Sequence, residues 1–375
     1  GVTCSGTPAE CSSQVCQVAE LDLTSYEMRG PIPPEIGELT FLKVLIFINN
    51  QLTGSIPPQV GDLDNLIYLS LYLNILTGII PPELGQLQAL KVLDLDDNPL
   101  TGTIPRELGN MTNLFAIYIG DNEITGSIPS ELGQLQALEQ LYLFSSHLTG
   151  RIPAEIGQLR KLKDLYLYSN QLTGAIPVEI GQLSALKLLG LFRNLLTGHL
   201  PVEVGQLSAL EDLVLFSNRL SGPIPTEIGH LNALEYLSLY SNYLTGTIPV
   251  EVCQLTKLKD LVLSLALLTG QIPAEVGQLM VLESFVVHSN QLTGSVPVEL
   301  MNIITLEYLV FHSNQFTGCI PPAVGQLTSL LSLYLHDNLL TGSIPIEIGR
   351  LSSLQLLHIF NNRLSGSIPD TIGLL

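Results

Sequence analysis

Hydrophobic and polar positions of this chain recur with a period of 24 residues and no insertion. In each copy a short alternation of apolar and polar residues is followed by one asparagine slot. That slot holds Asn50, Asn74, Asn98, Asn122, Ser146, Asn170, Asn194, Asn218, Asn242, Ala266, Asn290, Asn314, Asn338 and Asn362. An opening copy centred on Tyr26 brings the total to fifteen. A fixed period of this length predicts a solenoid in which each copy forms one coil.

The alternation within one copy predicts a short β-strand. Leu165 and Leu167 point to one side, whereas Asp164, Tyr166 and Tyr168 point to the other. Identical strands stacked once per copy form a parallel sheet that lines a concave face. The asparagine that follows is expected to bond backbone groups of its own coil and of the next coil.

The second half of each copy predicts a bend and a helical turn. Thr173-Gly174 bends the chain, and Pro177 precedes a short apolar stretch with Glu179 in its first turn, where the helix dipole favours an acid. The fold class is therefore an α/β solenoid of about fifteen coils, with a parallel concave sheet and short convex helical turns. Residues 1–17 are expected to form an N-terminal cap and residues 18–375 the solenoid. The array stops inside a fresh copy without a C-terminal cap, which suggests a fragment of a longer protein.

The repeat resembles the plant-type leucine-rich repeat of receptor-like kinase ectodomains and polygalacturonase-inhibiting proteins. The match runs from Asn170 to Gly181 and recurs over residues 18–373, and Gly1 to Cys4 is similar to that family's N-terminal cap. The resemblance implies a right-handed superhelix, a second short sheet at Leu-Thr-Gly-x-Ile-Pro and ligand capture on the inner face. The family's tryptophan-containing cap motif, paired C-terminal cysteines and kinase are not found in this sequence.

Charge and cysteine content limit the partners and the compartment. The net charge of −19, with only 15 lysines and arginines, argues against nucleic acid or an anionic membrane surface as a partner. No apolar run approaches the length of a membrane span, so membrane attachment would require a segment outside this chain. Cys4, Cys11 and Cys16 predict a disulfide of unknown pairing in an oxidising, extracellular or secretory setting. Cys253 and Cys319 are expected to be free, with Cys253 buried.

Candidate ligand contacts lie in the exposed strand slots of the concave face. The outermost slot carries five consecutive aromatic residues and then His288, His312 and His336, which His358 joins from a neighbouring slot. Exposed aromatic rows on a concave face are typical of a binding site, although stacked rings can equally serve stability alone. The predicted ligand-binding residues are Tyr142, Phe144, Asp164, Tyr166, Tyr168, Phe192, Arg193, Asp212, Phe216, Tyr236 and Tyr240.

Other polar residues give weaker signals. The histidine row suits a wet polar face, a soft divalent metal or a pH switch near 6. Asp96, Asp97 and Asp121 are weak calcium candidates, because Pro99 stands where a calcium loop needs glycine. Asn110 begins the only glycosylation sequon.

No catalytic motif is found, and no cofactor is expected. The sequence therefore predicts a non-enzymatic extracellular recognition module that binds a peptide, protein or glycan on its concave aromatic-lined face. The alternative is a structural or adhesive scaffold that packs against other components of a larger assembly.

Overall fold

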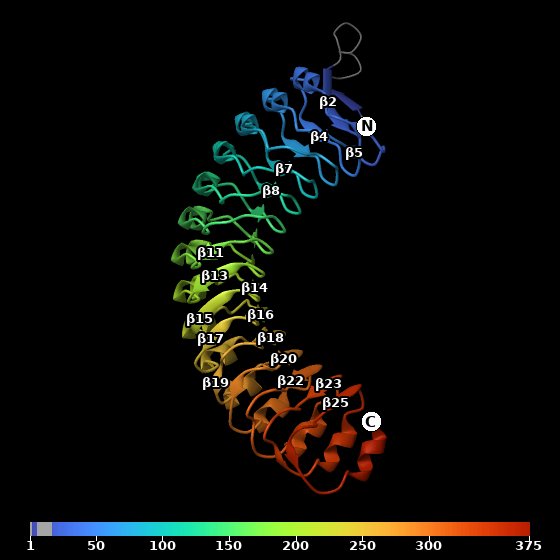
Figure 1. Cartoon of the computed structure of the whole chain (residues 1–375), viewed down its shortest axis with the longest axis vertical. Coiled ribbons are helices and arrows are strands. Elements are labelled where there is room, and N and C mark those ends of the chain that lie inside the picture. Colours follow the sequence, from blue (N-terminus) through green and yellow to red (C-terminus); the bar gives the residue numbers. More distant parts are fainter. Residues whose placement is uncertain (1, 6–16) are drawn as a thin grey trace. The chain divides into compact units, whose positions relative to one another are not determined.

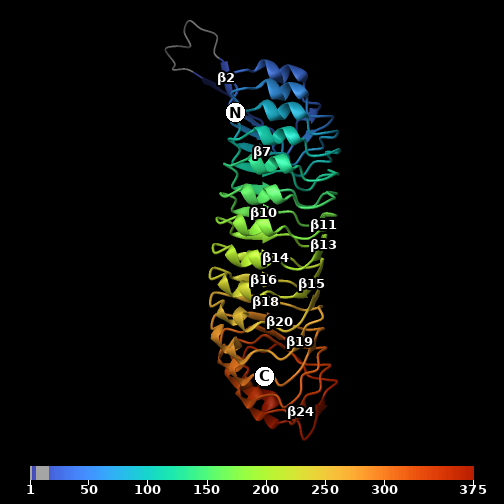
Figure 2. The ribbon, with the colours of Figure 1, turned by 90° about the vertical axis from the view of Figure 1, so that its left-hand side faces the viewer.

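The computed structural model describes residues 2–5 and 17–375. The chain divides into two compact units, Gly1–Leu186 and Lys187–Leu375. Within each unit the coils stack in sequence order, with strands on one side and short helices on the other (Figures 1 and 2). In the described part of the chain no helix is long and apolar enough to cross a membrane.

The first unit, blue to green in Figure 1, holds one main sheet and seven 3-10 helices in its described residues. The antiparallel strand β1 (Val2–Ser5) precedes seven parallel strands: β2 (Gln17–Asp22), β4 (Val44–Ile46), β6 (Tyr68–Ser70), β7 (Val92–Asp94), β8 (Ala116–Tyr118), β9 (Gln140–Tyr142) and β10 (Asp164–Tyr166). The helices are η2 (Pro34–Glu38), η3 (Pro58–Asp62), η4 (Pro82–Gln86), η5 (Arg106–Asn110), η6 (Ser130–Gln134), η7 (Ala154–Gln158) and η8 (Val178–Gln182). Short second-sheet strands are β3 (Arg29–Gly30), β5 (Gln51–Leu52) and β11 (Thr173–Gly174).

The second unit repeats this arrangement with eight main-sheet strands. These are β12 (Leu188–Gly190), β14 (Asp212–Val214), β16 (Tyr236–Ser238), β18 (Asp260–Val262), β20 (Ser284–Val286), β22 (Tyr308–Val310), β23 (Ser332–Tyr334) and β25 (Leu356–His358). The helices are η9 (Val202–Gln206), η10 (Thr226–His230), η11 (Val250–Gln254), η12 (Ala274–Gln278), η13 (Val298–Asn302), η14 (Pro322–Gln326), η15 (Ile346–Arg350) and η16 (Asp370–Leu374). Second-sheet strands are β13 (Leu195–Gly198), β15 (Arg219–Pro223), β17 (Tyr243–Thr245), β19 (Thr269–Gly270), β21 (Gln291–Leu292), β24 (Thr341–Gly342) and β26 (Arg363–Leu364).

The period-two alternation fixes which side of each strand is buried. Parallel strands pair in register one copy apart, as Leu141 with Leu165, so equivalent leucines stack in the core. Leu141, Leu165 and Leu167 are all essentially inaccessible to solvent, whereas Tyr142 and Tyr166 are half-buried on the other side. The predicted solenoid of fifteen coils with one strand and one helical turn each is confirmed.

The second short sheet forms where the Leu-Thr-Gly segment bends the chain. Gly174 adopts a φ of 77°, and glycines at the same slot of the other copies do the same. A left-handed backbone favours glycine, since it has no Cβ to clash. The Thr173 N–H donates to the Gly150 carbonyl of the preceding coil at 2.7 Å.

The asparagine slot forms a ladder of hydrogen bonds inside the solenoid. Asn74 Nδ2 donates to the Phe47 carbonyl of the preceding coil at 2.7 Å and to the Leu71 carbonyl of its own coil at 3.0 Å. Its Oδ1 accepts from the Leu52 N–H of the preceding coil at 3.1 Å. The sequence-based expectation of a bond to the next coil was therefore wrong, because the side chain points back toward the coil already formed.

The helical turns are single 3-10 turns whose spacing depends on one glycine slot. A Cβ on Gly157 would lie 2.3 Å from the carbonyl oxygen of Glu179 in the next turn, so only glycine permits this close approach. Cys253 and Met301 occupy the same slot in η11 and η13, and both side chains are buried. Those two turns consequently contact the following turn less closely.

Candidate functional site

On each strand of the main sheet, alternate side chains point away from the core. We call the surface formed by these side chains the main-sheet face of each unit. Shortly after each strand, a residue with a left-handed backbone lies directly before the asparagine slot, for example Ser145 with φ 46° and Ser169 with φ 54°. The bend is stabilised by the asparagine ladder, so the last exposed side chain before it has the same orientation in successive coils. Equivalent side chains therefore form rows across the strands.

Tyrosine and phenylalanine form two adjoining rows in the first unit. Tyr118, Tyr142 and Tyr166 follow one another on β8, β9 and β10, with ring centroids 4.9 and 4.7 Å apart. Phe144 and Tyr168 stack in the outer slot at 4.7 Å with planes 11° apart. We call these five residues the tyrosine patch. Each ring shields its neighbours, which leaves all five half-buried.

Polar groups connect the rings of the tyrosine patch. Tyr118 Oη donates to Gln140 Oε1 at 2.5 Å, and Gln140 Nε2 donates to Asp164 Oδ2 at 3.0 Å. Burial and the nearby Asp164 carboxylate raise the pKa of Tyr142 above its ordinary value.

A carboxyl group lies partly buried beside the tyrosine patch. Asp96 accepts a hydrogen bond from the Gly120 N–H. Burial, together with the neighbouring carboxylates of Asp94 and Asp121, raises the pKa of Asp96 to about 7 against the lowering effect of that hydrogen bond. Gly120 itself is covered by the Phe144 ring, since a Cβ there would lie 2.7 Å from Phe144 Cζ. The missing side chain thus lets the ring lie against the backbone.

The second unit carries its own aromatic stack near its N-terminal end. Phe192, Phe216 and Tyr240 stack in the outer slot, each pair at 4.4 Å with planes 17° and 10° apart. Asp212 pairs in register with Tyr236 on the neighbouring strand, and burial raises the pKa of Asp212. The remaining predicted residue of this unit, Arg193, is exposed at the left-handed position after Phe192, with φ 52°.

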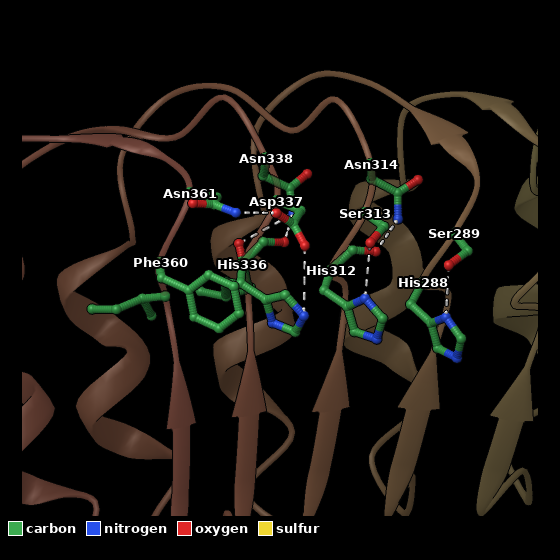
Figure 3. Close-up of polar contacts among 12 residues, drawn as sticks. His288, Ser289, His312, Ser313, Asn314, His336, Asp337, Asn338, Phe360 and Asn361 are labelled. Carbon is green, nitrogen blue, oxygen red and sulfur yellow. Dashed lines mark hydrogen bonds and ion pairs between the residues drawn. The ribbon is translucent and has the colours of Figure 1, made fainter.

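Histidines occupy the outer slot of the later strands of the second unit (Figure 3). His288, His312 and His336 stack at 4.4 and 4.3 Å with planes 10° apart. Burial, followed by the neighbouring His288 and His336, lowers the pKa of His312 to about 4, and burial also lowers that of His288. The expectation of a switch near pH 6 was therefore wrong for His312, because stacking removes water from its ring and places like charges together.

The remaining sequence candidates fall at the predicted places. Cys253 is free and buried and Cys319 is free, as predicted, and the structure shows that Cys319 is exposed. Asn110 is exposed at the end of η5. In the described residues no group of three or more His, Cys, Asp or Glu side chains is arranged to hold a metal ion. Cys11 and Cys16 lie outside the described residues, and the Cys4 side chain is likewise not described.

The structure brings together the predicted residues of each unit and adds some that the candidate set lacked. Gln140 connects Tyr118 to Asp164, and Gly120 positions Phe144. The alternation placed Gln140 in an exposed strand slot, which was the available signal. The absence of a side chain at Gly120 gives no such signal in the sequence, because its effect depends on where the Phe144 ring lies.

Stacked parallel strands, a backbone asparagine ladder and one 3-10 turn per copy define a leucine-rich-repeat solenoid. A pattern described as leucine-rich repeat region matches residues 68–173 and 154–269. The shorter Leucine Rich Repeat pattern matches residues 305–327, 329–351 and 353–375. The chain belongs to the leucine-rich-repeat family.

Solved structures place the chain near plant receptor ectodomains. A TDR receptor is 32% identical with a TM-score of 0.87, covering 96% of this chain and 66% of that chain. The plant peptide hormone receptor RGFR1, solved in complex with RGF2, is 32% identical with a TM-score of 0.78, covering 93% and 68%. A leucine-rich-repeat protein of Leptospira interrogans is 35% identical with a TM-score of 0.76, covering 94% and 86%. The chain thus spans only about two thirds of the two receptors, and no curated protein matches it.

Proposed function

We propose that this protein is a non-enzymatic extracellular recognition module that binds a peptide on its main-sheet face. Two classes of observation support the proposal. The first is the concentration of aromatic rings, interleaved with amide and carboxylate groups, on that face of the first unit. The second is the similarity to RGFR1, whose structure was solved with the peptide RGF2.

The tyrosine patch is the surface that suits an extended peptide best. Ring faces and edges offer apolar contact without much side-chain entropy to lose on binding, since neighbours already hold the rings. Gln140 and Asp164 lie between the rings and can accept backbone N–H groups of a bound chain. Such a mixture of rigid rings and polar groups is typical of the central part of a peptide interface.

The alternative is that the rings stabilise the sheet only. Neighbouring centroids 4.7 Å apart give each pair a favourable contact even without a ligand. The two functions differ in what alanine substitution changes. A binding role predicts a loss of affinity, and a purely structural role predicts a loss of stability alone.

Panning a random-peptide display library against the intact chain tests the proposal. Peptides that bind should lose affinity by about thirtyfold or more for Tyr142→Ala/Tyr168→Ala, corresponding to about 2 kcal/mol. Tyr243→Ala is the matched control, since Tyr243 is an aromatic residue that is 57% exposed on a second-sheet strand. If no peptide is enriched, or if the patch variant melts much lower but binds the peptides unchanged, the patch is structural and the proposal is wrong.

A further inference from the structure

A recess in the first unit lies directly beside the outer row of the tyrosine patch. Its wall includes Asp97, Asp121, Ser145 and Ser169, which occupy the same left-handed position of four successive coils. Ser145 and Ser169 directly follow Phe144 and Tyr168 in the chain. The segments that follow β9 and β10 therefore contribute both to the recess and to the stacked ring pair.

The asparagine ladder is interrupted in the wall of this recess. Ser146 stands in the asparagine slot, is 7% exposed, and has a hydroxyl without a hydrogen-bond partner among the described residues. In the coils on either side, Asn122 Oδ1 accepts from Leu100 N–H at 3.2 Å and Asn170 Oδ1 accepts from Leu148 N–H at 3.0 Å. Serine is too short to repeat that bond. The recess is thus lined by a buried hydroxyl, that of Ser146, which makes no hydrogen bond to the described residues.

The charge around the recess is acidic. Asp97 and Asp121 are exposed at its rim, one coil apart. Glu123 also lines it, and His147 is the only basic side chain among the lining residues. His147 Nε2 lies 2.9 Å from the Glu123 carboxylate.

The same excess of negative charge contributes to the raised pKa values of two neighbouring groups. The Asp121 carboxylate, after burial, contributes to the raised pKa of Tyr168. The carboxylates of Asp97 and Asp121 also contribute to the raised pKa of Asp96. A cation placed between these carboxylates and the ring pair would offset the negative charge that the carboxylates place near one another and near the rings.

We propose that this recess binds an arginine side chain of the ligand. The guanidinium pairs with Asp97 and Asp121, and its inner edge faces the Ser146 hydroxyl. Carboxylates on adjacent coils suit a planar fork with several donors. The inference rests on the proposed function, because it assigns the charge of one residue of the bound peptide.

The test uses a short peptide whose only charged group is one arginine, and the same peptide with the uncharged isostere citrulline in its place. Titrations are followed by the backbone amide signals of Gly120, Asp121 and Ser145 in the intact chain. The arginine peptide should bind about tenfold more tightly than the citrulline peptide, as expected for a charge-assisted hydrogen-bonded pair. Asp97→Asn/Asp121→Asn should abolish the difference.

Matched variants separate the recess from general attraction to an acidic protein. Asn already occupies the same left-handed slot at Asn49, so the aspartate changes preserve the backbone. Glu131→Gln/Glu155→Gln removes the same amount of charge from η6 and η7, and it should leave the affinity within about twofold. Ser146→Ala deletes a hydroxyl that makes no internal bond, so a loss of affinity of about threefold would report direct contact.

Three results would overturn the proposal. These are equal affinity for the arginine and citrulline peptides, an equal loss in the glutamate control, and no shift of the recess amides at saturating arginine peptide. If display-selected peptides still depend on the tyrosine patch under any of these results, the proposed function stands and only the arginine site is wrong. If tyrosine-patch dependence is lost as well, both fail.

Discussion

Ala266→Asn should stabilise the second unit, because it restores the interrupted ladder. In the adjoining coils Asn242 Oδ1 accepts from Leu220 N–H at 3.0 Å and Asn290 Oδ1 accepts from Leu268 N–H at 3.0 Å. The equivalent donor for position 266 is the N–H of Leu244, and the alanine methyl offers no acceptor to it.

The expected gain comes mainly from this one donor. The carbonyls that a new amide would reach already have partners, because Leu239 O accepts from Asn242 Nδ2 and Leu263 O from Asn290 Nδ2, both at 2.9 Å. A buried donor left unsatisfied costs about 1–3 kcal/mol, and ordering an asparagine side chain offsets part of the gain, so we expect about 1.5 kcal/mol. For a cooperative unit of this size that corresponds to a rise in Tm of about 3–6 °C.

Hydrogen exchange and thermal unfolding provide the assay. The Leu244 amide should exchange faster than those of Leu220 and Leu268, and residues 261–265 should exchange fastest among interior strands, since solenoid stability is a sum of neighbour interactions. Ala266→Asn should slow exchange at Leu244. Equal protection of the three amides in the natural chain, or an unchanged Tm in the variant, would refute the reasoning, because it would show that Leu244 already has an equivalent partner.

Three further outcomes are expected. Mass spectrometry of unreduced peptides should find a disulfide among the three cysteines of residues 1–17, and three free thiols would remove the argument for secretion. A thiol reagent should modify exposed Cys319 in the native chain and Cys253 only on unfolding, since burial raises the pKa of Cys253 to about 12; native modification of both would contradict this. Stability should be lost as pH falls from about 6.5 towards 4, because in that window unfolded His312 binds a proton that the folded residue, with a pKa of about 4, does not. Denaturant midpoints of His312→Gln should depend less on pH, and equal pH dependence would contradict this assignment.

The sequence predicted the fold in detail because every feature was repeated. A strand seen once as Leu165-Tyr166-Leu167 would be ambiguous, whereas recurrence in phase specified the strand, the parallel register and the helical turn. The direction of the asparagine ladder was missed, since spacing shows where a side chain stands and not which coil it contacts.

The candidate site was predicted as rows, but its internal contacts were not. Stacking of Phe144 on Tyr168 follows from their common slot. The Gln140 connection between tyrosines depends on side-chain conformations across three strands, which the sequence does not determine. The depressed pKa of His312 likewise follows from ring-to-ring distances that only the structure supplies.

The backward direction of the asparagine ladder has an evolutionary consequence. Asn74 satisfies a donor of the coil before it, and Asn98 does the same for its own predecessor. If recombination removes or duplicates one 24-residue copy inside a unit, the coils that become neighbours present the same donor and acceptor to each other. The number of copies can therefore change without a new interface between coils having to evolve. What each such event changes is the number of coils in every surface row, so the separation between residue clusters along the main-sheet face changes by whole coils at a time.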